Sequence, residues 1–216
     1  MISTIIFDFD GVILESVSVK TDAFRTLFSG VPEHVDEIVQ FHMDNGGMSR
    51  FDKFRYIYEN ILKKDLDPAT FKALSEKFSA LVFERVLNVP FVPGAGEFLK
   101  KYSSIIPLYI VSATPEQELR EIIQARDLTP FFRNVYGAPR KKAECISEIL
   151  TKSGVTAYDI VFVGDALNDL AAARLSGVTF IGRVKSGEKN IFRNCMDVKT
   201  VITDLYDLAA HIEGRS

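Results

Sequence analysis

Short runs of β-branched and aromatic residues recur along the chain, and most are followed by segments with helical periodicity. The first run, residues 5–14 (IIFDFDGVIL), has the composition of a buried strand, although it contains two aspartates. The later runs that predict strands are residues 107–113, 131–138, 159–166, 178–184 and the first part of 199–212. Because strands that alternate with helices form a parallel sheet covered on both faces, the chain predicts an α/β fold with a Rossmann-like core.

Helix signals follow these strands. Residues 114–128 (TPEQELREIIQARDL) predict a helix in which Thr114 is the N-cap, Pro115 the first helical residue and Gln117 the capping partner. Two further helices, each closed by a glycine, are predicted over residues 141–154 and 167–177, and the end of 199–212 predicts a last one.

Between the first two strands the alternating pattern is interrupted. Residues 15–90 show only helical periodicity, and the punctuated segment 88–99 (NVPFVPGAGEFL) marks the return to the core. We therefore expect an inserted, all-helical cap domain over residues 15–90 that lies above the strand ends. The catalytic core is expected to comprise residues 1–14 and 91–216.

The composition is that of an ordinary globular protein, with 47% hydrophobic and 25% charged residues among 216. A net charge of −3 and the lack of a basic stripe argue against nucleic-acid binding, and no apolar stretch is long enough to span a membrane. The first strand begins almost at the N-terminus without a secretory leader, so a cytoplasmic location is expected. Cys145 and Cys195 belong to no CxxC pattern and are expected to be reduced thiols.

Candidate chemistry gathers at the predicted carboxyl ends of the strands, where open parallel sheets bind ligands. Asp8 and Asp10 lie two residues apart on one side of the first strand, and carboxylates about 4 Å apart repel by roughly 4 kcal/mol at an effective dielectric constant near 20. Either one acid holds a proton or a cation lies between them. Other polar residues follow the later strands: Ser112, Thr114, Arg140, Lys141, Lys142, Asp165, Asn168 and Asp169. Such carboxylates suit a hard divalent cation, and a lysine beside a free aspartate suits phosphoryl transfer.

Four segments, DFDGVILES, VSAT, KKAE and GDALND in that order, resemble the signature motifs of the haloacid dehalogenase superfamily of phosphohydrolases. The resemblance extends from residue 5 to about residue 183 and is greatest to the capped phosphatase branch, which includes phosphoglycolate phosphatases and β-phosphoglucomutases. It implies a phosphatase fold with a helical cap and Mg²⁺ as the cofactor.

The resemblance also implies a role for each motif residue. Asp8 would be the nucleophile, and Asp10 would protonate the leaving oxygen and then activate water, with its backbone carbonyl helping to bind the metal. Ser112 would bind the phosphoryl group, Lys142 would neutralise the nucleophile and the phosphate, and Asp165 would ligate magnesium.

Further assignments leave alternatives open. Asp169 is expected to be a metal-shell residue or a partner of the lysine, or else a plain helix cap. Lys141 competes with Lys142 for the catalytic position, although the spacing into the helix favours Lys142. Gly11, Ala113 and Thr114, from the same motifs, are expected to contact the substrate.

Asp10 selects among branches of the superfamily, because the dehalogenases and the phosphonate-cleaving relatives lack an acid there. Since Asp10 must hold a proton in the first half-reaction, we expect neighbouring Asp8 to raise its pKa. Similar sugar phosphomutases carry a cap histidine where this chain has Lys20, which weakens the mutase interpretation. Lys20 is expected either to contact the substrate or to face solvent.

The segment 42–54 (HMDNGGMSRFDKF) is the most informative part of the cap. Gly46 and Gly47 would end one helix, and Ser49 with Asp52 would form a capping box for the next. A glycine loop that enters a helix N-terminus can present N–H groups to an anion, so Gly47 is a candidate substrate contact.

Two bases follow that loop, Arg50 and Lys53, which share one face of the next helix and are both candidate substrate contacts. We expect the loop to close over the active site, with Arg50 reaching a substrate carboxylate, hydroxyl or second phosphate. The alternative is an ordinary turn with solvated bases. His34 and His42 are expected to be surface or packing residues.

The sequence therefore predicts a cytoplasmic, Mg²⁺-dependent phosphomonoesterase that forms an aspartyl-phosphate intermediate. Its substrate would be a small phosphorylated metabolite, such as phosphoglycolate, a sugar phosphate or a nucleotide. A sugar phosphomutase, or a binding or regulatory module with a decayed site, are the alternatives. The oligomeric state, monomer or dimer, stays open.

Overall fold

The computed structural model describes residues 2–214, and within them six parallel strands form a single sheet in the order β3-β2-β1-β4-β5-β6. From β1 to β6 the strands are Thr4–Phe7, Leu108–Pro115, Asn134–Ala138, Ile160–Gly164, Thr179–Arg183 and Thr200–Ile202. The direction of strand order reverses between β1 and β4. Such a reversal leaves a crevice at the carboxyl ends of the strands, and this is where doubly wound sheets bind ligands.

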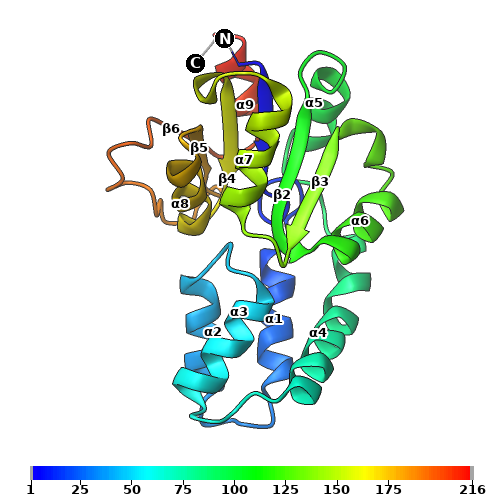
Figure 1. Cartoon of the computed structure of the whole chain (residues 1–216), viewed down its shortest axis with the longest axis vertical. Helices are drawn as coiled ribbons and strands as arrows, with labels where there is room; N and C mark the ends of the chain where they lie inside the picture. Colours follow the sequence, from blue (N-terminus) through cyan, green and yellow to red (C-terminus); the bar gives the residue numbers. More distant parts are fainter. Residues whose placement is uncertain (1, 215–216) are drawn as a thin grey trace.

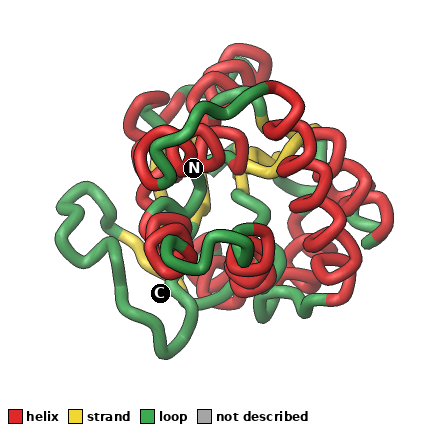
Figure 2. The backbone as a smooth tube through the Cα atoms, turned by 90° about the horizontal axis from the view of Figure 1, so that it is seen from below, coloured by secondary structure: helices red, strands yellow, loops and turns green. Residues whose placement is uncertain are grey.

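Helices cover both faces of the sheet (Figure 1), and in the view from below most of the strands lie between helices, with loops beside the strands at one edge (Figure 2). Helices α5, α6 and α9 pack on one face, while α7 and α8 pack on the other. In the described part of the chain the α-helices α1 to α9 are Val17–Leu27, Val35–Asp44, Arg50–Tyr56, Pro68–Asn88, Ala95–Tyr102, Glu116–Ala125, Lys142–Ser153, Leu167–Ser176 and Leu205–Ile212. The predicted α/β fold is confirmed.

Strand β1 explains why the first apolar run shows little alternation. Ile5 and Phe7 pack with the core on the α5 and α9 side, whereas Ile6 packs with the core on the α7 and α8 side. All three side chains are fully buried. Both faces of a central parallel strand are covered, so consecutive residues are apolar.

The segment between β1 and β2 is helical, as expected. Helices α1 to α4, with a π-helical turn at Ile57–Ile61, form a separate layer below the carboxyl ends of the strands (Figure 1). Phe24 lies at the centre of this layer, with ring centroids 5.8 Å from Phe54 and 4.9 Å from Phe78. The domain boundaries drawn from the sequence stay a prediction.

Two predicted element boundaries were wrong. The first strand ends at Phe7, so Asp8 and Asp10 lie in the connection that follows it. Thr114 is not an N-cap, because β2 continues to Pro115, which pairs with Ala138 beyond a bulge. The hydroxyl of Thr114 donates to a carboxylate instead.

Other expectations about local structure are confirmed. Gly154 and Gly177 close α7 and α8 in the left-handed conformation, and the last segment forms β6 and α9. Cys145 and Cys195 are free thiols. Within residues 2–214, every helix is too short or too polar to cross a bilayer.

Candidate active site

Asp8 lies directly after the central strand, and its carboxylate is buried with a side-chain exposure of 5%. Its Oδ1 atom lies 3.0 Å from Lys142 Nζ but accepts no well-aligned hydrogen bond from any group within residues 2–214. Burial raises the pKa of Asp8 to about 7, against the opposing charge of Lys142. A buried carboxylate oxygen without a hydrogen bond is costly, so Asp8 has an open position for a cation or a reacting group.

Lys142 is held between two aspartates. Its Nζ atom lies 2.5 Å from Asp169 Oδ1, and Asp169 in turn accepts a 3.1 Å hydrogen bond from the Ala166 backbone at Oδ2. Burial alone would lower the pKa of Lys142, but the charges of Asp169 and Asp8 raise it above its usual range. Lys141 is the exposed N-cap residue of α7. The structure therefore brings Lys142, and not Lys141, to Asp8.

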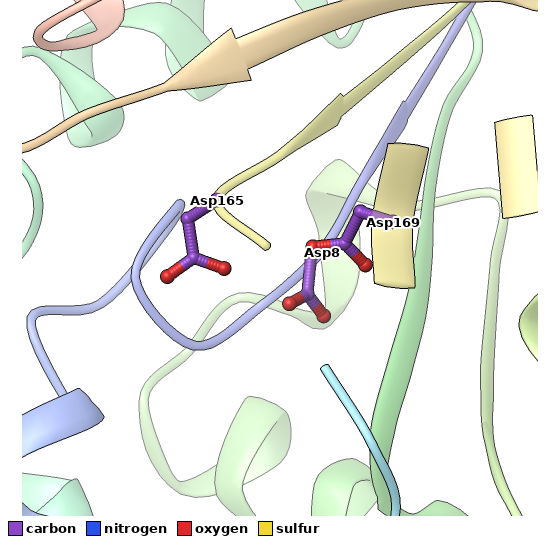
Figure 3. Close-up of side chains that lie close together, drawn as sticks. All are labelled: Asp8, Asp165 and Asp169. Atoms are coloured by element: carbon purple, nitrogen blue, oxygen red, sulfur yellow. The ribbon is translucent and has the colours of Figure 1, made fainter. Parts of the chain in front are cut away.

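Asp8, Asp165 and Asp169 converge, each with one carboxylate oxygen within 4.8 Å of the others (Figure 3). Burial, and then the charges of Asp8 and Asp169, raise the pKa of Asp165 well above its usual value. Three oxygen donors of this kind fit a hard divalent cation such as Mg²⁺, which would relieve the repulsion. Because both oxygens of Asp169 already have partners, Asp8 and Asp165 are the side chains best placed to ligate it.

Asp10 does not join this cluster, because its carboxylate is held by three other groups. Ser16 Oγ donates to Oδ1 at 2.6 Å, and Lys20 Nζ and Thr114 Oγ1 both donate to Oδ2. Burial by itself would raise the pKa of Asp10, but the Lys20 charge and these hydrogen bonds hold it below its usual value. The prediction that Asp8 raises the pKa of Asp10 was wrong, because the positive charge of Lys20 and the three hydrogen bonds outweigh the effect of burial.

Lys20 is itself largely buried, with 17% of its side chain exposed, so the solvent-facing interpretation was wrong. Besides its ion pair with Asp10, it donates a 2.7 Å hydrogen bond to Thr114 Oγ1. Ser112 precedes Thr114 on β2, is buried, and accepts the Thr114 backbone N–H at 3.2 Å. The end of β2, including Ala113, thus lies beside Asp10.

Gly11 lies in the connection after β1 and packs closely against Asp165. Its φ of +75° is accessible to glycine at little cost, and a Cβ atom there would overlap the Asp165 carboxylate. Arg183, at the end of β5, donates to the Gly11 carbonyl at 3.1 Å and to Glu15 at 2.6 Å. Arg183 was not predicted as a site residue, although its position at the end of a predicted strand was a signal for it.

The loop between α2 and α3 reaches the catalytic edge of the sheet. Asn168 Nδ2 donates a 2.8 Å hydrogen bond to the Gly46 carbonyl. A Cβ atom on Gly47, which has a φ of +73°, would lie 3.2 Å from the Cβ atoms of Ala166 and Asn168. The expected N-cap at Ser49 is present, because its Oγ accepts the Asp52 N–H. This loop therefore lies against the segment that carries Asp165 and Asp169.

Arg50 has a different partner from the one expected. It is 5% exposed, and both of its terminal nitrogens donate to Glu118 on α6, in a bidentate pair. Arg50 also donates to Ser79 Oγ at 2.8 Å, and Ser79 donates to Glu118 at 2.5 Å. Both terminal nitrogens of the guanidinium group thus bind α4 and α6, and the group is not solvated in this arrangement.

Lys53 is also buried, and its partner is His42. Its Nζ atom lies 2.9 Å from His42 Nδ1 and donates to the His42 carbonyl at 3.0 Å. Burial, and then the charges of Lys53 and Lys20, lower the pKa of His42 to about 3, so the ring is neutral, and the tautomer with a free Nδ1 can accept from the Lys53 ammonium group. The His42 ring stacks on Phe24 with centroids 4.3 Å apart, which agrees with the expected packing role. His34 is the half-buried residue before α2.

Comparison with known proteins agrees with this geometry. A family model for haloacid dehalogenase-like hydrolases matches residues 2–177. A phosphoglycolate phosphatase from Pseudomonas syringae pv. tomato is 26% identical over 224 residues, which cover 96% of this chain and 81% of that protein. A hydrolase from Pseudomonas syringae has a TM-score of 0.80 at 21% identity, with 98% of each chain covered. CbbY from Rhodobacter sphaeroides, solved with xylulose-(1,5)bisphosphate, has a TM-score of 0.74 at 18% identity, with 96% of each chain covered.

Proposed function

The chain belongs to the haloacid dehalogenase-like hydrolase family, and from this premise we propose that it is a Mg²⁺-dependent phosphatase of a small phosphorylated metabolite. One observation carries the proposal above all. The buried Asp8 carboxylate has an oxygen without a hydrogen bond, 3.0 Å from a buried lysine and beside two further aspartates. Such a site provides a nucleophile, a fixed positive charge and oxygen donors for a cation at one place.

The first half-reaction uses Asp8 as the nucleophile. An oxygen of its carboxylate attacks phosphorus, and the bond from phosphorus to the leaving oxygen breaks, which gives an aspartyl phosphate. Lys142 remains protonated beside Asp8 and offsets the charge of the phosphoryl group. Asp8 and Asp165, with the backbone carbonyl of Asp10, would hold Mg²⁺, which supplies positive charge that keeps these carboxylates ionised and neutralises phosphoryl oxygens.

Asp10 is the general acid and then the general base of the proposed reaction. Because its pKa is low in the structure, Asp10 is ionised before the substrate arrives. An incoming phosphoryl dianion would raise that pKa, so Asp10 can take up the proton that it later gives to the leaving oxygen. In the second half-reaction the ionised carboxylate accepts a proton from the water that attacks phosphorus and frees Asp8.

The surroundings support binding of a phosphoryl group and exclusion of water. Ser112 and Thr114, with Ala113 between them, line the end of β2 as hydrogen-bonding groups for its oxygens, and Gly11 and Gly47 allow close approach of the backbone. Helices α1 to α4 lie over the site, and a cover of this kind can shield the reaction from solvent.

The proposal is tested by phosphate release from a panel of phosphoglycolate, hexose phosphates, nucleotides and a small aryl phosphate. We expect release that requires Mg²⁺, is abolished by EDTA, and is lost in Asp8→Asn. No release from any compound would contradict the proposal and favour a binding or regulatory module. Conversion of a hexose phosphate into its isomer, with a sugar bisphosphate as activator, would indicate a phosphomutase instead.

A further inference from the structure

Lys53 is a buried cation without a carboxylate partner. It is 3% exposed, and within the described residues no acid lies close enough to form a salt bridge with it. Its two contacts, the Nδ1 atom and the carbonyl oxygen of His42, are neutral acceptors that leave the third amine proton unused. An uncompensated charge at such depth is strongly unfavourable, so packing alone does not account for a lysine here.

Lys53 lies on α3, the helix that follows the loop packed against Ala166 and Asn168 in the segment between Asp165 and Asp169. Its charge interacts with those of Lys20, Lys142, Asp10 and Asp165, which belong to the catalytic centre. The position is also rigid, because Nζ lies 5.6 Å from the centroid of the Phe24 ring on which His42 stacks. The lysine is therefore fixed in the helical layer, within range of the charges of the catalytic centre.

Neighbouring cations provide an internal contrast. Arg50, one turn earlier on α3, is neutralised by Glu118, and Lys20 on α1 is neutralised by Asp10. Of these three buried bases in the helical layer, Lys53 alone has no acidic partner among residues 2–214. Its missing counter-charge can therefore be supplied by a substrate.

We propose that Lys53 is an anion subsite that binds a carboxylate of the substrate, a short distance from the phosphoryl group. This inference rests on the proposed function and names its substrate class, a phosphomonoester of a small hydroxy acid. A carboxylate fits better than a second phosphate, because a single amine has one unused proton and the bidentate group of Arg50 is already occupied.

Binding of phosphonates tests the subsite without turnover. These compounds have a phosphorus–carbon bond in place of the phosphoester bond that a phosphatase hydrolyses. Isothermal titration calorimetry with Mg²⁺ would compare phosphonoacetate with ethylphosphonate, which lacks the carboxylate. The full chain should bind phosphonoacetate about 10- to 100-fold more tightly. In Lys53→Met and Lys53→Gln this ratio should fall close to one, whereas exposed Lys72→Met should leave it unchanged.

Several outcomes would overturn the inference. Equal affinities for the two phosphonates in the full chain, or an unchanged ratio in both Lys53 variants, would show that no carboxylate subsite exists there. Tighter, Lys53-dependent binding of methylenediphosphonate than of phosphonoacetate would show that the subsite serves a phosphate. Thermal melting confirms that both variants fold; Gln keeps a donor for the His42 carbonyl should Met not be tolerated.

A failure of the proposed function can be distinguished from a failure of the subsite. Phosphate release from a small aryl phosphate, measured in parallel, needs no carboxylate subsite. A chain that keeps the phosphonate preference but releases no phosphate would contradict the phosphatase assignment and support the subsite. A chain that releases phosphate but does not prefer phosphonoacetate would support the phosphatase assignment and contradict the subsite.

Discussion

Replacement of Arg50 by alanine should destabilise the protein strongly. The change leaves Glu118, a residue that is 8% exposed, with the Ser79 hydroxyl as the one remaining partner of its carboxylate among residues 2–214. Removal of one member of a buried ion pair typically costs about 3–5 kcal/mol, because the remaining charge stays in a medium of low polarity. The guanidinium also lies 4.5 Å from the centroid of Phe78, and loss of that contact adds to the cost.

The double variant Arg50→Met/Glu118→Leu should behave differently. Two apolar side chains of similar volume leave no buried charge, so its free energy of unfolding should stay within about 2 kcal/mol of the wild-type value or exceed it. A double-mutant cycle with Arg50→Ala and Glu118→Gln should therefore show strong coupling. Because the chain has no tryptophan, urea unfolding would be followed by far-ultraviolet circular dichroism.

Two results would refute this reasoning. A loss below about 1 kcal/mol for Arg50→Ala, or additive single changes, would show that the pair with Glu118 contributes little. A normal free energy of unfolding with a raised KM for the native substrate alone would instead restore the direct substrate contact that the sequence favoured for Arg50.

Three further outcomes are expected. Gly11→Ala should weaken Mg²⁺ binding far more than Gly154→Ala, because both glycines have positive φ but only Gly154 has open space around it; equal effects would contradict this. Burial and the Lys20 charge lower the pKa of Lys53 from 10.5 to about 7, so the unfolded chain takes up this proton at higher pH than the folded one. Wild type should therefore lose stability relative to Lys53→Met as pH falls from about 10 to 7, and parallel stability curves would refute this. Lys20→Met should raise the pKa of Asp10 and move the acidic limb of the kcat/KM profile upward by about 1 to 3 pH units, whereas an unmoved limb would show that Lys20 does not control it.

Local sequence patterns were sufficient to predict the sheet and the edge of it that carries the catalytic residues. The strands after residue 100 lie where their apolar runs indicated, and Asp8, Lys142 and Asp165 meet at one edge because parallel strands end there together. Where the pattern failed, a tertiary contact decided the outcome. The residues after Thr114 are typical of a helix N-terminus. Thr114 nevertheless lies in β2, because the pairing of β2 with β3 extends to Pro115 and Ala138.

The partners of the charged residues in the helical layer could not be predicted. Arg50 and Glu118 are 68 residues apart, and Lys20 and Thr114 are 94 apart, so no spacing rule connects them. The direction of the pKa shift of Asp10 depends on its contact with Lys20, so this direction could not be predicted from the sequence. The helical layer was recognisable by its periodicity, whereas its orientation over the site was not.

The central claim is that Asp8 accepts the phosphoryl group, and it is tested most directly by rapid acid quench during turnover with Mg²⁺, followed by peptide mass spectrometry. We expect the peptide that contains Asp8 to gain the mass of one phosphoryl group, with fragment ions placing it on Asp8, and no such gain in Asp8→Asn. Sustained phosphate release with an unmodified Asp8 peptide, or with Asp8→Asn as active as the wild type, would contradict the mechanism.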